Sequence, residues 1–180
     1  MLERLYNPAH SSRKESRLLE WNDEYFMTEA LKEAGRAAEQ GEVPVGAVIV
    51  HGESSIIARA HNQTEMLHDA TAHAEMLAIT QAAEHLENWR LLDCTLYVTI
   101  EPCTMCCGAM VLSRLPRLVY GADDPKHGAV RSISNALGNE KFNHEVKVIS
   151  GILKGETSAI LSEFFQRLRS RSKPDGNGSS

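Results

Sequence analysis

The order in which strand-like and helix-like segments follow one another constrains the fold of this chain more than any other feature of its sequence. Two apolar segments, 45–50 and 55–61, are predicted to form a hairpin around the turn His51-Gly52. A helix ending at Gln40 precedes the hairpin. Further strands are predicted over 95–100, 118–121 and 146–149, and further helices over 72–86, 104–113 and 156–169. This alternation favours α/β layers around one sheet.

Length and charge bound the organisation of the chain. Its 180 residues suit a single domain, which we predict to span 21–169 between flexible extensions at 1–20 and 170–180. The net charge is −5, and because both ends are basic the excess of acidic groups lies in the body of the chain. An acidic body argues against a general polyanion binder, so a nucleic-acid role must rest on local features.

No segment of the sequence suggests export or a membrane. The longest apolar stretch, VPVGAVIV at 43–50, is too short to cross a bilayer, and the first residues form no apolar signal-peptide core. We therefore expect no membrane association and a cytoplasmic location. In that reducing compartment Cys94, Cys103, Cys106 and Cys107 suit metal binding or catalysis better than disulfides.

Two short motifs carry the chemistry: His73-Ala74-Glu75, and Pro102-Cys103 followed by Cys106. Each lies at the start of a predicted helix. Two cysteines three residues apart can hold one ion at the first turn of a helix, where the partial positive charge favours thiolate over thiol. Thiolates and imidazole are the ligands that zinc prefers. The sequence therefore predicts a zinc site made by His73, Cys103 and Cys106.

The number of ligands indicates catalysis. A structural zinc site normally has four protein ligands, whereas three leave a position for water, which can then ionise near about pH 7. Glu75 lies two residues beyond His73. Its carboxylate can therefore reach such a water and transfer protons without binding the metal.

Other interpretations of the cysteines stay open on the sequence alone. A C-x-x-C pair can be a redox site, although nothing else in the chain resembles a thioredoxin. A structural zinc site would need a fourth ligand from Cys94, Cys107, His127 or His144. We predict that Cys94 is a small buried residue, that the Cys107 side chain points elsewhere than that of Cys106, and that both histidines lie at the surface.

Together the two motifs match the signature H-x-E…P-C-x-x-C of zinc nucleobase deaminases. The chain resembles the cytidine deaminase superfamily and, within it, the bacterial tRNA-specific adenosine deaminases, the TadA-like enzymes. The similarity runs from Trp21 to Arg169. It rests on the segments GEVPVGAVIV (41–50), HN (61–62), TAHAEMLAI (71–79), EPCTMCCGAM (101–110), YGADDPKHGA (120–129), FNHEV (142–146) and LSEFFQRLR (161–169).

This resemblance implies both a fold and an activity. The fold is three-layered, with a five-stranded mixed sheet flanked by helices, and it assembles as a homodimer. The activity is that of a hydrolase, the zinc-dependent deamination of adenosine to inosine at the wobble position of a tRNA anticodon. The implied cofactor is one zinc ion per subunit.

The resemblance also assigns roles to residues. It implies that His73, Cys103 and Cys106 are the zinc ligands and that Glu75 is the catalytic proton shuttle. The substrate-binding residues that it implies for the flipped base and the anticodon loop are Asn62, Val45, Ala47, Asp124, Lys126 and Phe165. From the residues alone, Asn62 is equally well a turn residue, and Phe164 and Phe165 are mostly core residues.

The chain departs from the family pattern at Asp123, where a neutral or basic residue is common, and at Arg131, where a small residue is common. Asp123 would weaken the local attraction for phosphate, and Arg131 could restore it.

Two rival functions share the zinc motif. One is the deamination of a free purine or nucleoside, such as guanine, and the other is a non-enzymatic zinc module that binds RNA or protein. A saturated fourth ligand would favour the module, whereas activity on a small purine would favour the first rival.

Overall fold

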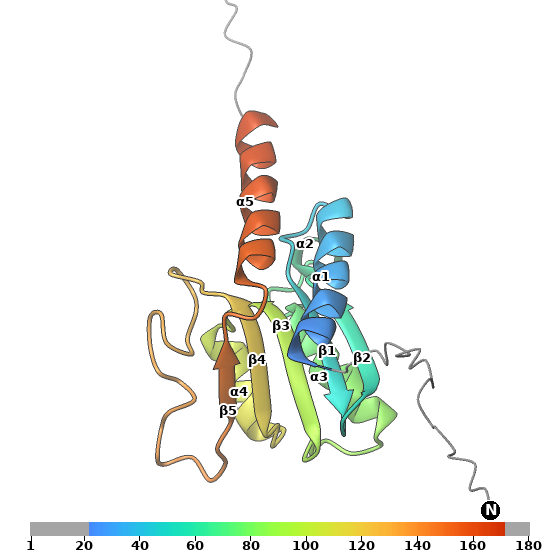
Figure 1. The fold of residues 1–180 in the computed structure, drawn as a ribbon, viewed down its shortest axis with the longest axis vertical. Coiled ribbons are helices and arrows are strands. Elements are labelled where there is room, and N and C mark those ends of the chain that lie inside the picture. The colour runs from blue at the N-terminus through green and yellow to red at the C-terminus, as the bar shows by residue number, and fades with distance from the viewer. Residues whose placement is uncertain (1–21, 172–180) are drawn as a thin grey trace, which may run out of the picture.

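The computed structural model describes residues 22–171, and its elements follow the predicted alternation (Figure 1). The elements are α1 (Asp23–Glu39), β1 (Gly46–His51), β2 (Ser55–His61), α2 (Thr64–Leu67), α3 (Ala74–His85), β3 (Cys94–Ile100), α4 (Thr104–Leu112), β4 (Arg117–Ala122), β5 (Lys147–Ser150) and α5 (Lys154–Arg171). Among these helices none is long and apolar enough to cross a membrane. The predicted extension at 1–20 and most of that at 170–180 lie outside the described residues.

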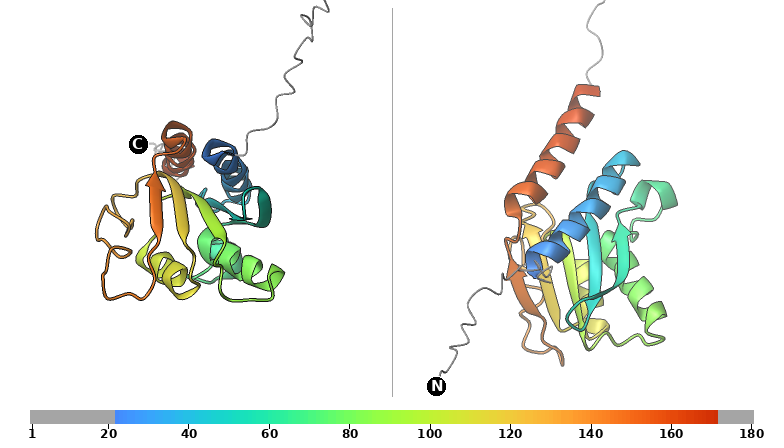
Figure 2. Two further views of the ribbon diagram at one scale, coloured as in Figure 1. Left: turned by 60° about the horizontal axis from the view of Figure 1, so that its bottom comes forward. Right: turned by 45° about the vertical axis from the view of Figure 1, so that its right-hand side comes forward.

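The strands form one mixed sheet in the order β2-β1-β3-β4-β5. β1 is antiparallel to both β2 and β3, whereas β3, β4 and β5 run parallel to one another. Helices α1 and α5 lie on one face of the sheet, and α3 and α4 lie on the other (Figure 2). The predicted three-layer α/β fold with a five-stranded mixed sheet is thereby confirmed.

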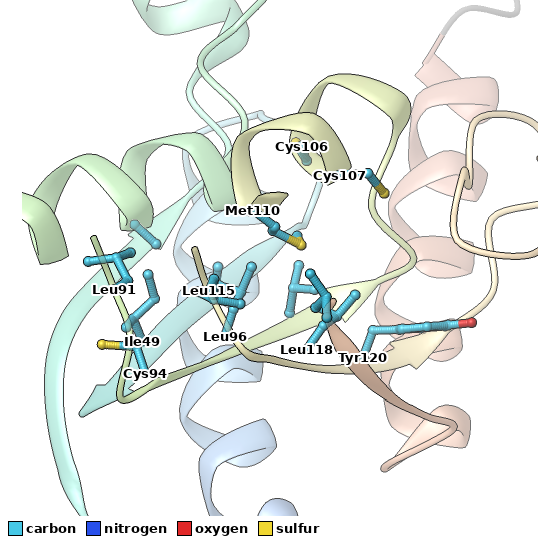
Figure 3. Packing of buried hydrophobic residues seen from close by; sticks show 14 of the residues in the cluster. Ile49, Leu91, Cys94, Leu96, Cys106, Cys107, Met110, Leu115, Leu118 and Tyr120 are labelled. Carbon is cyan, nitrogen blue, oxygen red and sulfur yellow. The ribbon is translucent and has the colours of Figure 1, made fainter. Parts of the chain in front are cut away.

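Side chains that alternate along the strands divide the core between the two faces. Ile49, Leu96 and Leu118 pack toward α3 and α4, and Figure 3 shows Met110 pointing from α4 toward them. On the opposite face, α1 packs against Val48, Val50, Tyr97 and Val119. Because β1 is covered on both faces, its sequence is an almost continuous apolar run.

A glycine fixes the distance between α1 and the start of β1. A Cβ atom built on Gly46 would lie 2.1 Å from the Ala30 carbonyl oxygen and 2.3 Å from the Ala34 backbone nitrogen. Only a residue without a side chain allows the helix and the strand to approach so closely.

Two features near the site differ from the sequence prediction. The helix predicted from residue 72 begins at Ala74, because His73 is extended (φ −73°, ψ 151°) and its backbone nitrogen donates to the Thr71 carbonyl at 2.7 Å. The short helix α2 has no periodic pattern that would predict it. Its Met66 nitrogen donates to the Glu42 carboxylate at 2.7 Å, a contact that is remote in the sequence.

Candidate metal centre and active site

The candidate site forms where two helices begin. His73 caps the N-terminus of α3, and Cys103 caps that of α4, with Cys106 in the first turn of the same helix. The capping residues keep extended backbones, so their side chains precede the helices rather than lie along them. The partial positive charge at a helix start favours anionic sulfur, which makes this a suitable place for thiolates.

The three donor atoms form a nearly equilateral triangle. His73 Nδ1 lies 3.6 Å from Cys103 Sγ and 3.7 Å from Cys106 Sγ, and the two sulfur atoms are 3.7 Å apart. Tetrahedral zinc with ordinary bond lengths requires about 3.6 Å between nitrogen and sulfur and about 3.8 Å between two sulfurs. This group could hold a metal ion, and its dimensions fit zinc.

The ionisation of the sulfur atoms also suits a cation. The hydrogen bond from Cys106, reinforced by that from His73, lowers the pKa of the Cys103 thiol to about 3 even though burial opposes this. The same contact with Cys103, together with burial, raises the pKa of the Cys106 thiol. The two sulfurs therefore compete for one negative charge. A divalent cation between them would allow both to be thiolates.

Glu75 lies beside this triangle without belonging to it. It occupies the first turn of α3, is 3% exposed, and its carboxyl group interacts electrostatically with His73, Cys103 and Cys106. Burial raises the pKa of this carboxyl group above its ordinary value. Its oxygens are not among the donors that converge on one point. A buried carboxyl with a raised pKa is suited to taking up and releasing a proton near neutral pH.

The other candidate ligands lie elsewhere. In the range 22–171 no further His, Cys, Asp or Glu joins the donor group. Cys107 is buried and its thiol donates to the Pro102 carbonyl, so its side chain points away from the neighbouring ligand (Figure 3). Cys94 is buried at the start of β3, as predicted. His127 is exposed as predicted, whereas His144 is half-buried and donates to a backbone carbonyl.

Asn62 is held firmly where β2 ends. Its backbone nitrogen donates to the Val45 carbonyl at 3.0 Å, and its side-chain Nδ2 donates to Glu42 Oε2 at 3.0 Å and to Thr64 Oγ1 at 2.6 Å. Half-buried Val45 and fully buried Ala47 belong to the apolar cluster that also includes the two cysteines of the donor triangle. The structure thus brings Val45 and Ala47 to the side of the sheet that carries the metal centre, and Asn62 is bonded to the backbone of Val45.

Glu42 is a residue of this site that sequence reasoning did not identify. It is 1% exposed, and its two oxygens accept hydrogen bonds from Asn62 and from the Met66 backbone. Both partners lie at least 20 residues further along the chain, so no local pattern reveals the contact. The available signal is an acidic residue that directly precedes the apolar stretch 43–50.

Asp124 and Lys126 lie in the loop that follows β4. Asp124 Oδ1 accepts hydrogen bonds from the backbone nitrogens of Lys126 at 2.9 Å and His127 at 3.2 Å, so this carboxylate shapes the turn. The Lys126 side chain is exposed. The same loop reaches the metal-binding segment, because the Ala129 nitrogen donates to the Pro102 carbonyl at 2.8 Å.

The two departures from the family pattern, Asp123 and Arg131, are bonded to each other. Asp123 Oδ1 accepts from Arg131 Nη2 at 2.6 Å and Nε at 3.0 Å, and Asp123 Oδ2 accepts from Lys154 Nζ at 2.7 Å. The hydrogen bond from Lys154, followed by that from Arg131, lowers the pKa of Asp123. Arg131 is therefore occupied within the protein rather than left free for phosphate.

The two neighbouring phenylalanines of α5 differ in how far they are buried. Phe164 is 9% exposed and Phe165 is 42% exposed, with the rings in edge contact at 5.5 Å. The spacing-based prediction of a core residue is right for Phe164 and wrong for Phe165. The reason is that neighbouring residues of a helix point about 100° apart, so that Phe164 lies on the covered side of α5 while Phe165 faces solvent.

Comparison with known proteins agrees with this geometry. The MafB19-like deaminase family matches residues 21–169. A tRNA-specific adenosine deaminase from Bacillus subtilis (strain 168) is 53% identical over 152 residues, which make up 84% of this chain and 93% of that protein. The chain belongs to the tRNA-specific adenosine deaminase family. It is therefore an enzyme of the hydrolytic deaminase class.

Solved structures resemble this deaminase over most of its length. A chain from studies of A-to-I editing by tRNA:A34 deaminases has a TM-score of 0.73 and 47% identity, and the match covers 76% of this chain and 99% of that one. Guanine deaminase from Bacillus subtilis has a TM-score of 0.55 and 29% identity, with 87% of this chain and 98% of that chain covered. The fold is therefore shared with an enzyme named for a different purine.

Proposed function

We propose that this deaminase converts adenosine to inosine by zinc-dependent hydrolysis at the wobble position of a tRNA anticodon. The observation that carries the proposal is the zinc-sized triangle of three donors with a buried carboxyl group directly beside it. The names of the Bacillus subtilis relative and of the tRNA:A34 deaminase structure support tRNA as the substrate.

His73 Nδ1, Cys103 Sγ and Cys106 Sγ would hold the zinc ion. Zinc bound by three ligands supplies a water molecule acidic enough to act as a nucleophile at neutral pH. The remaining chemistry is proton transfer, which we assign to the carboxyl group of Glu75.

Glu75 would take one proton from the water that adds to C6 of adenine and deliver it to a ring nitrogen. It would then take the second proton of that water and deliver it to the amino group, so that the carbon–nitrogen bond breaks and ammonia leaves as the carbonyl group of inosine forms. The place of Glu75 in the first turn of α3, two residues after the ligand His73, keeps it within reach of the reacting atoms. Burial raises the pKa of this carboxyl group above its ordinary value, which is the direction of shift that a proton-transferring carboxyl group needs. Such general acid–base transfer contributes about 10²–10⁴-fold to the rate.

The surroundings of the metal centre favour a base in a single-stranded loop. A base must leave its stack before it can be deaminated, and an already unpaired loop nucleotide requires the least energy. Half-buried Val45 would form the apolar wall of the base pocket with fully buried Ala47 packed behind it, and Asn62 would bind the base edge. Outside the pocket, Asp124 and Lys126 would lie in a loop that touches the RNA, and the exposed ring of Phe165 would shape the anticodon-loop pocket.

A free purine is the second candidate substrate, because the fold is shared with Bacillus subtilis guanine deaminase. The test is to incubate the zinc-loaded protein with an anticodon stem-loop carrying adenosine at the wobble position, with free adenosine and with guanine. A stem-loop with guanosine at the wobble position is the matched control. We expect inosine from the first RNA alone. Xanthine from guanine, without inosine from the RNA, would contradict the proposal, and zinc binding without any product would indicate a non-enzymatic module.

We also propose that the enzyme is a cytoplasmic homodimer. Leu112 of α4 is 74% exposed and Leu92 is 64% exposed. The chain segments that carry them are joined, because the Leu91 nitrogen donates to the Ser113 carbonyl at 2.8 Å. Neighbouring exposed leucines are typical of a surface that binds another protein, in this case a second copy of the chain. The free thiols of the described cysteines and a tRNA substrate both suit the cytoplasm.

A further inference from the structure

A buried carboxylate outside the donor triangle organises the loop that follows β4. Glu101 is 2% exposed. Its Oε1 accepts hydrogen bonds from the backbone nitrogens of Val130 at 3.1 Å, Arg131 at 2.7 Å and Ser132 at 2.9 Å. Its Oε2 accepts from the Asp124 nitrogen at 3.1 Å and from the Ser132 hydroxyl. One side chain thus binds both ends of the loop segment 124–132.

The middle of the same segment is pressed against this carboxylate. A Cβ atom built on Gly128 would lie 2.3 Å from Glu101 Oε2 and 2.6 Å from the Asp124 carbonyl oxygen. The Gly128 nitrogen donates to that carbonyl at 2.9 Å, which closes the turn that contains Lys126. The backbone of the loop therefore lies so close to Glu101 that only glycine fits at position 128.

Glu101 also stands next to the metal centre in the chain. It is followed directly by Pro102 and by the donor Cys103, and the Pro102 carbonyl accepts a hydrogen bond from Ala129 of the loop. Glu101 and Pro102 therefore join two parts of the site: the backbone that precedes Cys103 and the loop that contains Asp124 and Lys126.

The buried acid Glu29 makes a different kind of contact. Glu29 is 7% exposed, and its carboxylate pairs with the side chains of Lys32 and Arg59. Those contacts hold side chains together. The contacts of Glu101 are to backbone nitrogens, with one hydroxyl in addition, so they determine where a stretch of main chain runs.

We propose that Glu101 is a positioning residue that sets the Asp124–Lys126 turn at a fixed place relative to the metal centre, so that the RNA held by the turn presents its base to Glu75. This inference rests on the proposed function. Glu101 itself touches neither the substrate nor the metal. Its loss should therefore weaken RNA binding more than it slows the chemical step.

The test replaces Glu101 by glutamine, which places an amide donor against backbone N–H groups. The variant and the wild type are compared for zinc content, for kcat and KM on the anticodon stem-loop, and for the stem-loop Kd measured in a Glu75→Gln background. We expect one zinc per subunit, kcat within about threefold of the wild type, and KM and Kd raised by about tenfold, corresponding to the loss of roughly one hydrogen bond to a charged group.

A double-mutant cycle distinguishes positioning from general stability. Lys126→Ala should weaken RNA binding clearly in the wild type and only slightly in the Glu101→Gln protein, because the turn that holds Lys126 is already displaced. Glu29→Gln is the matched control: it removes another buried carboxylate that accepts hydrogen bonds, and it should leave the effect of Lys126→Ala unchanged. Gly128→Ala places a Cβ atom against the Glu101 carboxylate, so it displaces the same turn and should reproduce the result of Glu101→Gln.

Several results would overturn the proposal. One is a Glu101→Gln protein with wild-type KM and the full effect of Lys126→Ala. Another is loss of zinc in that variant, which would make Glu101 a support of the metal centre. Failure of both Glu101→Gln and Gly128→Ala to fold would make it a stability element. If the wild type bound the stem-loop without deaminating it, the proposed function would fail, while the Kd values would still test the positioning role.

Discussion

The substitution Glu42→Gln tests how the candidate base pocket is built. In the wild type, one carboxylate oxygen accepts a hydrogen bond from Asn62 Nδ2 at 3.0 Å and the other accepts from the Met66 nitrogen at 2.7 Å. Glutamine keeps one acceptor and turns an amide donor toward the other partner. A buried hydrogen bond to a charged group is lost, which costs about 2–3 kcal/mol. For a protein of this length that lowers Tm by about 5–10 °C.

The assay is thermal unfolding of the zinc-loaded protein, together with KM on the anticodon stem-loop. Because Asn62 loses an anchor, KM should rise along with the fall in Tm. Glu65→Gln, at an exposed position of α2, is the control and should change stability by less than about 0.5 kcal/mol. A Glu42→Gln protein with an unchanged Tm and an unchanged KM would refute the role of Glu42 as the anchor of Asn62.

Three further results are expected. Asp123→Asn should release Arg131 and Lys154 from their ion pairs, so that both cations can interact with RNA phosphates. Fluorescence anisotropy should then show stem-loop binding that is about two- to fivefold tighter at low salt and more strongly dependent on salt. Weaker binding by the variant would contradict this expectation. Burial alone would raise the pKa of Glu101, but hydrogen bonds from Ser132 and nearby backbone nitrogens lower it. The ionised Glu101 side chain should therefore stabilise the fold fully above about pH 4.3, the pKa of an unfolded glutamate, and this contribution should be lost as the pH falls through the lower pKa of the folded protein. In urea unfolding, the difference in unfolding free energy between the wild type and Glu101→Gln should therefore be largest above about pH 4.3. Leu112→Glu should convert the dimer to a monomer in light scattering, and a dimer that persists would exclude this surface.

The fold could be predicted from the sequence to within a few residues at most element ends. Strand β2 begins and ends where the sequence predicts, and the predicted strands at 95–100 and 118–121 are each extended at their ends in the structure. These elements are set by local alternation and by apolar runs, which a single sequence displays directly. The start of α3 is displaced by two residues because a turn ending at His73 takes its place.

The donor triangle could likewise be predicted, because each of its halves lies within a few residues of sequence. Glu42 and Glu101 could not, because their partners are contributed by segments 20 to 31 residues away. The exposure of Phe165 was also hidden from the sequence, since periodicity shows an apolar stripe but not how much of the width of that stripe another element covers. Local patterns thus predict the chemistry of the site, while the contacts that position it depend on the completed fold.

The rate of inosine formation by the Glu75→Gln protein is the sharpest test of proton transfer by a carboxyl group beside the metal. The variant keeps His73, Cys103 and Cys106, so it should bind one zinc ion per subunit and bind the anticodon stem-loop as the wild type does. Its single-turnover rate on that RNA should fall by about 10²–10⁴-fold. A zinc-loaded Glu75→Gln protein that forms inosine at the wild-type rate would remove Glu75 from the mechanism.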